Sequence, residues 1–293
     1  MGPTRDAEFE SEWEWDETLF LGAAPYSRRG RLPYAPGLAA ALRTALGLDG
    51  RGRLLDVGCG PGTLALLLAG HFAEVVGVDP DAGMLAEAER ATAEAPPASR
   101  VRWVRARAEE LPTGLGQFDV AVFGQSFHWM ERAAVAADVR ARLRPAGVLV
   151  HVSDLKGENR PVADLPHPAV PRAAIDALVR RYLGAVRRAG RGSLPRGTPS
   201  GEAAVFRRAG FTGPRRLTVP GGQGLQRSYD DVVAGVFALS SSAPHLFGAR
   251  RAEFEAELRH LLGETAPAGL FSERQPSTEV FLWENGAAGA VGG

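Results

Sequence analysis

Short apolar runs alternate with helix-forming segments along the first half of the chain. The runs are rich in β-branched residues and have the length of buried strands, whereas the segments between them are rich in Ala, Leu, Met and Glu. The expected strands are residues 53–57, 75–78, 101–104, 118–123 and 148–152, and the expected helices are 64–69, 82–95 and 135–143. Because parallel neighbours need a crossover connection, this alternation predicts a doubly wound α/β sheet.

The pattern changes after Asp154. A proline-studded loop comes first, and helices then interrupt the strands. The expected elements are a loop at 156–171, helices at 172–188, 203–209, 230–239 and 250–262, and strands at 211–219 and 277–283. The two strands complete a seven-stranded, mostly parallel sheet. Open α/β sheets bind ligands beyond the carboxyl ends of their strands, so we expect the inserted helices to cap that edge.

These elements divide the chain into consecutive parts. The expected parts are an N-terminal helical flap at 1–36, a ligand-binding core at 37–154, a helical insertion or cap at 155–200, the C-terminal part of the sheet at 201–285 with a helical insertion at 227–264, and a disordered Gly/Ala tail at 286–293. The tail contains only Gly, Ala and Val after Asn285, which leaves it little to pack with.

Charge and cysteine content narrow the classes of partner. The 293 residues carry 34 basic and 34 acidic side chains, so no net charge draws the protein to nucleic acid or to an anionic membrane. Cys59 is the single cysteine, which excludes an intrachain disulfide and a Cys-pair metal site; we expect no metal. No secretory signal and no long apolar stretch is apparent, so we expect a soluble, cytoplasmic protein, monomeric or homodimeric.

A glycine-rich motif follows the first expected strand. Residues 56–62 read D-V-G-C-G-P-G, at a strand-to-helix turn. A dinucleotide fingerprint would need its third glycine at position 63, which is Thr63 here, so no pyrophosphate cradle is specified. Small residues let the backbone approach a bulky nucleoside, and Asp56 can accept a hydrogen bond from an ammonium group.

An acid also ends the second expected strand. Asp79 lies where doubly wound folds place a carboxylate for ribose hydroxyls. A lone turn glycine or a lone strand-end acid is more often structural. The motif and the acid together favour binding of a nucleoside cofactor.

These segments carry a resemblance to a known family. Residues 54–63 (LLDVGCGPGT), 75–84 (VVGVDPDAGM), 107–112 (RAEELP) and 118–129 (FDVAVFGQSFHW) resemble the class I S-adenosylmethionine-dependent methyltransferase superfamily. Within it, the chain is similar to bacterial small-molecule enzymes such as the ubiquinone/menaquinone and trans-aconitate methyltransferases. The resemblance covers about half of the chain and concerns the cofactor, not the acceptor.

The resemblance implies a set of contacts with S-adenosylmethionine. Asp56, Gly58 and Gly60 are expected at the methionyl part, Asp79 at the ribose, Ala108 and Glu109 at the adenine, and Gly124 and Gln125 beside the transferred methyl; Cys59, Pro80 and Met84 belong to the same motifs. The run 26–36 (YSRRGRLPYAP) resembles the Y…R-P-x-Y-P lead-in of such enzymes, which implicates Tyr26, Arg31 and Tyr34. Leu32 interrupts the Arg-Pro pair, and aromatic packing is an equal alternative for Tyr34.

His128 is the candidate catalytic residue. Methyl transfer needs mainly alignment and exclusion of water, and a hydroxyl acceptor benefits from a general base. His128 follows the fourth strand, beside the expected methyl position, although a structural role in the loop is the commoner fate of such a residue. His151 lies within a β-run and His71 near a helix end, so we expect both to be structural.

We therefore expect an S-adenosylmethionine-dependent methyltransferase that acts on an O, N or C nucleophile of a small metabolite in bacterial natural-product biosynthesis and that releases S-adenosylhomocysteine. The alternative is a protein that keeps the fold and binds the cofactor for a non-methylating reaction or for binding alone. A nucleic-acid methyltransferase is disfavoured by the charge balance, and a nicotinamide dehydrogenase by the glycine spacing.

Overall fold

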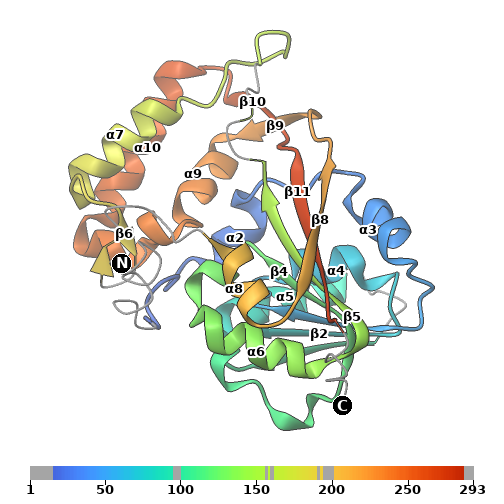
Figure 1. Ribbon diagram of the computed structural model, residues 1–293. Helices are drawn as coiled ribbons and strands as arrows, with labels where there is room; N and C mark the ends of the chain where they lie inside the picture. Colours follow the sequence, from blue (N-terminus) through green and yellow to red (C-terminus); the bar gives the residue numbers. More distant parts are fainter. Residues whose placement is uncertain are drawn as a thin grey trace, which may run out of the picture.

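A seven-stranded sheet forms the centre of the protein, in the order β3-β2-β1-β4-β5-β11-β8 (Figure 1). The computed structural model describes residues 16–94, 100–155, 158, 162–189, 192–193 and 201–286. The strands are β1 (Arg53–Val57), β2 (Glu74–Asp79), β3 (Arg100–Arg105), β4 (Phe118–Gly124), β5 (Leu143–Asp154), β8 (Thr212–Val219) and β11 (Thr278–Glu284). Only β11 among them runs antiparallel to its neighbours, β5 and β8, which confirms the mostly parallel sheet.

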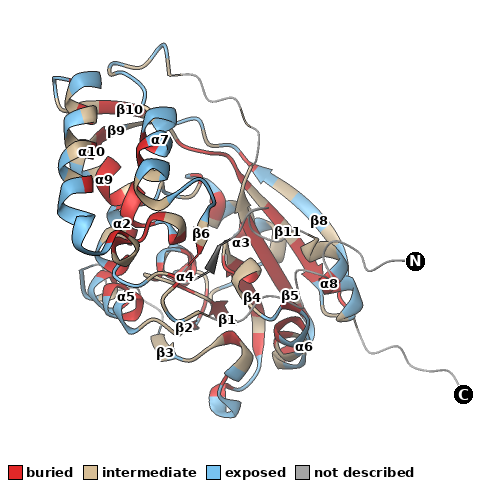
Figure 2. Ribbon diagram, turned by 90° about the vertical axis from the view of Figure 1, so that its left-hand side faces the viewer, coloured by how far each residue is buried: buried red, intermediate tan, exposed pale blue. Residues whose placement is uncertain are grey.

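Helices cover both faces of this sheet. One face packs against α3 (Leu38–Leu46) and α4 (Thr63–Ala69), and the other packs against α6 (Arg132–Arg142) and α8 (Glu202–Arg208). The central strands β1 and β2 are buried almost throughout, as expected of parallel strands covered on both sides (Figure 2). Next to the first face, α5 (Ala82–Glu94) contacts β2 and β3.

A cap stands over one end of the sheet (Figure 1). It contains α7 (Arg172–Leu183), α9 (Tyr229–Phe237), α10 (Arg251–Thr265) and a two-stranded sheet of β9 (Gly224–Ser228) and β10 (Leu270–Arg274). Its own core is built from α7, α9, α10 and β10, together with Phe247 of the intervening 3-10 segment. The N-terminal helix α2 (Ala24–Gly30) packs along α9 and also contacts α5. Two short strands, β6 (Arg188–Ala189) and β7 (Gly192–Ser193), pair with each other, and short 3-10 helices lie at Ala108–Glu110, Thr113–Leu115, Phe127–Trp129, Ser240–Ser242 and Pro244–Arg250.

The expected elements differ from the observed ones at three points. The helix expected at 172–188 ends at Leu183, because Gly184 adopts φ 90° and stops it. The strand expected at 148–152 begins earlier, at Leu143, and its start is irregular: Ala146 has φ 64° and the pairing with β4 shifts register. The pair β9 and β10 was not expected, since its residues show little apolar alternation. The first fifteen residues of the flap and residues 287–293 of the tail lie outside the described residues.

Among the described residues, no single helix has the length and apolar content needed to cross a membrane. The pair formed by Tyr229–Phe237 and Ser240–Thr265 meets that test only jointly, and the two parts are bent by 99° at their break.

Candidate active site

A cavity of about 1640 Å³ lies between the carboxyl ends of the parallel strands and the cap. Almost all residues that the sequence singled out line it. They are Arg31, Tyr34, Asp56, Gly58, Cys59, Gly60, Asp79, Pro80, Met84, Ala108, Glu109, Gly124, Gln125 and His128. Most of these residues come from β1, β2, β4 and the connections after β1 to β4, and Arg31 and Tyr34 come from the segment after α2. The fold therefore brings distant motifs to one edge of the sheet.

The glycine turn after β1 is shaped by close packing. Gly58, Gly60 and Gly62 have φ of 70°, 53° and 76°, a region in which side chains with a Cβ are strained. A Cβ on Gly58 would lie 2.6 Å from the Cβ of Ser126, whereas a Cβ on Gly60 would meet nothing within 4 Å. Gly58 therefore permits packing against the end of β4, and Gly60 faces the open cavity.

Asp79 holds this turn in place. Its Oδ2 accepts a hydrogen bond from the Gly60 amide at 2.9 Å, and its Oδ1 accepts one from the Asp81 amide at 2.9 Å. Burial raises the pKa of Asp79 to about 6, although both amide donors oppose the shift. Each carboxylate oxygen can accept a further bond, so Asp79 can shape the turn and still receive hydroxyl donors.

Asp56 is the least satisfied polar side chain of the site. It is 1% exposed, and neither carboxylate oxygen has a hydrogen-bond partner of normal geometry. Burial raises its pKa to about 7; the Ala65 backbone amide opposes the shift, and the nearby Asp79 charge adds to it. A buried, unpartnered acceptor is costly, and such cost is typical of a group that awaits a ligand.

The end of β4 forms the next part of the cavity wall. Gln125 adopts φ 58°, which is unusual for a residue other than glycine, and its amide donates to the Val152 carbonyl at 3.1 Å. Ser126 donates from its hydroxyl to the Val57 carbonyl at 2.6 Å and so ties β4 to β1. Strained backbone held by surrounding bonds clusters at functional sites.

Arg31 and Tyr34 approach from the segment after α2. Arg31 donates from Nη2 to the Ala238 carbonyl at 2.9 Å, and its burial beside the cavity lowers its pKa. A Cβ on Gly124 would lie 2.8 Å from the Tyr34 hydroxyl, so a glycine at this position lets the phenol reach the end of β4. Burial, with Asp56 and Asp154 nearby, raises the pKa of Tyr34, which keeps the phenol protonated.

Tyr26 does not line the cavity. Its ring packs against Phe237 with centroids 5.1 Å apart, and Arg251 donates to its hydroxyl. In this arrangement Tyr26 joins α2 to the cap, and its expected role over the cofactor stays a prediction.

The residues expected at the adenine lie in the connection after β3, at the cavity. Ala108 is buried, and Glu109 accepts a hydrogen bond from the Glu131 amide at 2.8 Å. The carboxylate of Glu109 thus positions the start of α6. Met84 packs among Ala23, Ala24 and Ala243, which links α5 to the N-terminal segment.

Two histidines face the cavity. His128 lies beside Trp129, with ring centroids 4.8 Å apart, in the 3-10 turn after β4. His151, which we expected to be structural, is 9% exposed and also lines the cavity. Its place three residues before the carboxyl end of β5 was the signal for this, since that edge of the sheet binds ligands. Among the described residues, no group of three or more His, Cys, Asp or Glu side chains is placed to hold a metal ion.

Comparison with known proteins agrees with this arrangement. Residues 54–147 match the methyltransferase domain family. Together with the fold, this match agrees with the resemblance seen in the sequence: residues 54–147 form a methyltransferase domain similar to those of class I S-adenosylmethionine-dependent methyltransferases. S-adenosylmethionine is the cofactor of this family.

Individual relatives match parts of the chain. The malonyl-[acyl-carrier protein] O-methyltransferase of Enterobacter lignolyticus is 31% identical over 45% of this chain and 54% of its own length. The ubiquinone biosynthesis O-methyltransferase of Azorhizobium caulinodans is 38% identical over 39% of this chain and 40% of its own length. The chain spans about half or less of the length of the first curated relatives it matches. The crystal structure of the [4+2]-cyclase SpnF shares the fold, with a TM-score of 0.51, 18% identity and 98% of each chain covered.

The residues present fit this cofactor. The unpartnered Asp56 carboxylate, the open space at Gly60 and the acceptor capacity of Asp79 line one continuous wall of the cavity. An ammonium group, a nucleoside and two hydroxyl groups are the features that such a wall can bind.

Proposed function

We propose that this protein transfers a methyl group from S-adenosylmethionine to a small-molecule acceptor bound in the cap side of the same cavity. The observation that carries the proposal is the buried Asp56 carboxylate, which lines the cavity beside the glycine turn and has no hydrogen-bond partner of normal geometry among the described residues. A ligand ammonium would supply the missing donors and favour the ionised form of the carboxylate.

The residues of the chain then have separate tasks. The cofactor, when bound, supplies a methyl group on a positively charged sulfur and leaves as S-adenosylhomocysteine. Asp56 would accept from its ammonium, and Asp79 would accept from its ribose hydroxyls while holding the Gly60 turn. The cap covers this end of the sheet and excludes water, so that acceptor and donor remain aligned.

His128 is proposed as the general base for a hydroxyl acceptor. It lines the cavity in the turn after Gly124 and Gln125, where the acceptor would meet the methyl group. His128→Ala is expected to lower turnover by about 10²- to 10⁴-fold, the usual contribution of a general base, while S-adenosylhomocysteine affinity stays nearly constant. Unchanged turnover would return His128 to a structural role beside Trp129.

Calorimetric titration tests the cofactor directly. We expect S-adenosylmethionine and S-adenosylhomocysteine to bind with micromolar affinity and NAD not to bind. Binding of NAD alone would exclude the proposal. Acceptors can then be sought by a mass increase of one methyl group; a different product from a cofactor-bound protein would favour a non-methylating use of the site.

We propose that the acceptor belongs to bacterial specialised metabolism, because the inserted helices form a cap over the site.

A further inference from the structure

The cavity is larger than one ligand needs. Its volume of about 1640 Å³ exceeds the roughly 300–1,000 Å³ of an ordinary small-molecule pocket. The part of the lining that would hold the cofactor, which includes Asp56, Gly60 and Asp79, lies at the ends of β1, β2 and β4; we call it the cofactor wall. Much of the remaining lining comes from β5 and β11 on one side and from the cap on the other, and α8 and residues 17–21 contribute as well.

The cap side of the cavity carries an apolar strip beside charged residues, two of which, Arg172 and Glu273, pair with each other. Ile175 of α7 and Val232 and Val236 of α9 line it. At its edge, Leu239 is 40% exposed and Leu21 is 50% exposed, and both line the cavity too. Large apolar side chains left open to solvent in this way commonly mark a binding surface.

The opposite side, at the strand ends, is polar. Ser153 on β5 is opposite Glu279 on β11, and His151 is opposite Phe281, so the four side chains share one face of the sheet. Glu279 is paired with Arg216 of β8, and the neighbouring strand-end acid Asp154 lies near Arg31. Acids and bases are therefore balanced here, and the strand ends offer hydrogen-bonding groups without an excess of either charge.

We infer that the acceptor is an uncharged amphiphile: its apolar body lies against Ile175, Val232, Val236 and Leu239, and its hydroxyl group lies at the strand ends near Ser153 and His151. This inference rests on the proposed function, because the hydroxyl is placed beside the cofactor wall. A fully hydrophilic acceptor would leave the apolar wall in contact with water or polar groups. A strongly charged one would have to displace the Glu279–Arg216 pair or the Arg172–Glu273 pair, or remain unpaired in a partly buried site.

The test uses 1-naphthol, an uncharged aromatic alcohol, as the probe. It is titrated calorimetrically into the full chain, with and without saturating S-adenosylhomocysteine. Glucose serves as a hydrophilic probe with hydroxyl groups, and 1-naphthoate as an apolar probe with a negative charge. We expect 1-naphthol to bind more tightly than either.

Two leucines provide a matched pair of variants. Leu239 lines the cavity, whereas Leu67 on α4 is 39% exposed, nearly the same as the 40% of Leu239, but does not line it. Leu239→Ser is expected to weaken 1-naphthol binding about fivefold or more, and Leu67→Ser to leave it unchanged. Leu21→Ser, in a different segment, gives a second reading with the same expected direction as Leu239→Ser.

Each outcome decides one question. Equal 1-naphthol affinities of the Leu239→Ser and Leu67→Ser variants would overturn the apolar wall, and tighter binding of glucose or 1-naphthoate would overturn the uncharged amphiphile. Failure of S-adenosylhomocysteine to bind the wild-type chain would overturn the proposed function instead. The affinity of 1-naphthol in the absence of S-adenosylhomocysteine would still test the apolar side of the cavity separately.

Discussion

The sheet and the cap are stabilised in different ways. In the sheet, β1 and β2 are buried almost along their whole length between two layers of helices, and contacts repeat regularly from strand to strand. In the cap, one compact group of rings dominates: Phe247 stacks on Phe254 at 4.0 Å, and both lie near Phe237. Burial of residues in strand after strand stabilises the sheet, whereas the cap depends on contacts between a few residues that lie far apart in the sequence. Loss of one such contact should affect the cap more than loss of one strand contact affects the sheet.

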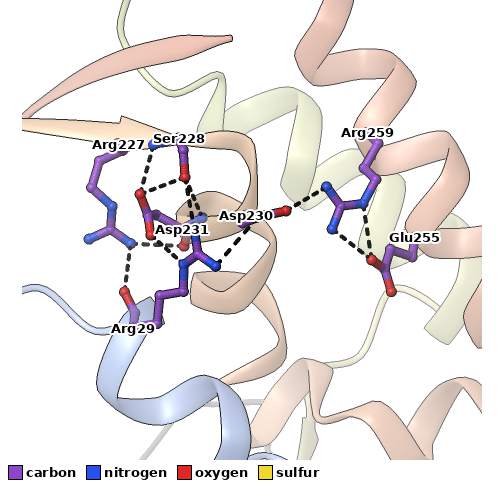
Figure 3. A network of polar contacts seen from close by, with 7 residues as sticks. All are labelled: Arg29, Arg227, Ser228, Asp230, Asp231, Glu255 and Arg259. Carbon is purple, nitrogen blue, oxygen red and sulfur yellow. Dashed lines mark hydrogen bonds and ion pairs between the residues drawn. The ribbon is translucent and has the colours of Figure 1, made fainter.

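The two regions meet where α2 packs on α9. Arg227 is buried, and its Nη2 donates to the carbonyls of Gly30 at 2.9 Å and Asp231 at 2.8 Å. Arg29 pairs with Asp231 in the capping box that starts α9 (Figure 3). The segment that carries Arg31 and Tyr34 to the cofactor wall is thus fastened to the helix that carries Val232 and Val236.

The largest expected effect lies at the glycine turn of the sheet. Gly58→Ala is expected to weaken S-adenosylhomocysteine binding about 100-fold or more and to lower Tm, because its Cβ would lie 2.6 Å from Ser126 and 2.9 Å from Met130. Gly50→Ala is the control: Gly50 also has positive φ, 85°, but its Cβ would meet nothing within 4 Å. Calorimetry and thermal unfolding of both variants separate the effect of steric overlap with neighbouring atoms from that of backbone strain. Equal losses of affinity and Tm in the two variants would mean that steric overlap at Gly58 is unimportant.

The joint between α2 and α9 comes next. A Cβ on Gly30 would lie 2.3 Å from the backbone carbonyl of Ala234, so Gly30→Ala must push the two helices apart. We expect a loss of about 1–3 kcal/mol in the free energy of unfolding, as for overpacking. Protease cleavage should also become faster in the cap than in the sheet.

Gly70→Ala provides the comparison, because Gly70 follows α4 with right-handed backbone angles and open space around its Cβ position. It is expected to leave stability unchanged or slightly higher. If cleavage of Gly30→Ala accelerated equally in sheet and cap, the view of the joint as a separate weak point would be wrong.

The difference between the regions also explains what the sequence predicts. The strands of the sheet and their helices follow from local apolar runs, and the Asp56 and Asp79 positions follow from motif and spacing alone. The carboxyl ends of parallel strands must meet at one edge, so the site residues that follow β1 to β4 line one cavity. Arg31 and Tyr34, which only the family resemblance implied, line it from the segment after α2. These are consequences of periodicity and topology.

The remainder depends on contacts that local patterns do not encode. Strand β9 pairs with β10 across the whole of α9 and α10, and its polar residues give no alternation. Tyr26 was expected at the cofactor by its motif, but its ring contacts Phe237, more than two hundred positions away. His151 was expected to be structural from its β-run; its ring lies beside Phe206 and Phe281, and the run alone does not show that it also lines the cavity.

The pH dependence of stability tests the buried Asp56 carboxylate, which belongs to neither the sheet core nor the cap core but lines the cavity. Burial raises the pKa of Asp56 in the folded state from 3.8 to about 7. At a pH below the unfolded-state pKa the carboxyl is protonated in both states and does not reduce the free energy of unfolding. As the pH rises through 7 the buried group must ionise, and its destabilising effect becomes complete. Asp56→Asn is therefore expected to stabilise the unliganded protein at pH 8, on the order of a few kcal/mol at about 1.4 kcal/mol per pKa unit, with a gain that shrinks toward pH 4. Thermal unfolding at several pH values measures it.

Asp49→Asn is the control for this effect. Asp49 is exposed, and hydrogen bonds from Arg51 lower its pKa, so removal of its charge should give no gain at pH 8. The same Asp56→Asn protein is expected to bind S-adenosylhomocysteine more weakly at pH 8. A Tm difference between Asp56→Asn and wild type that stays constant from pH 5 to pH 8 would contradict the buried, unpartnered carboxylate.

The smallest expected effect compares two arginines near α9. Arg227→Gln leaves buried carbonyls without a donor and is expected to cost about 1–3 kcal/mol of the free energy of unfolding. Arg259→Gln removes only partly exposed ion pairs with Asp230 and Glu255, and is expected to cost at most about 1 kcal/mol (Figure 3). Because Arg227 holds the segment that leads to Arg31 and Tyr34, its variant should also weaken S-adenosylhomocysteine binding, which the Arg259 variant should not. Equal losses of stability in the two variants, with no loss of affinity in either, would mean that α2 is held to α9 by packing at Gly30 alone. The hydrogen bonds of the buried Arg227 guanidinium would then not connect the cap to the cofactor wall.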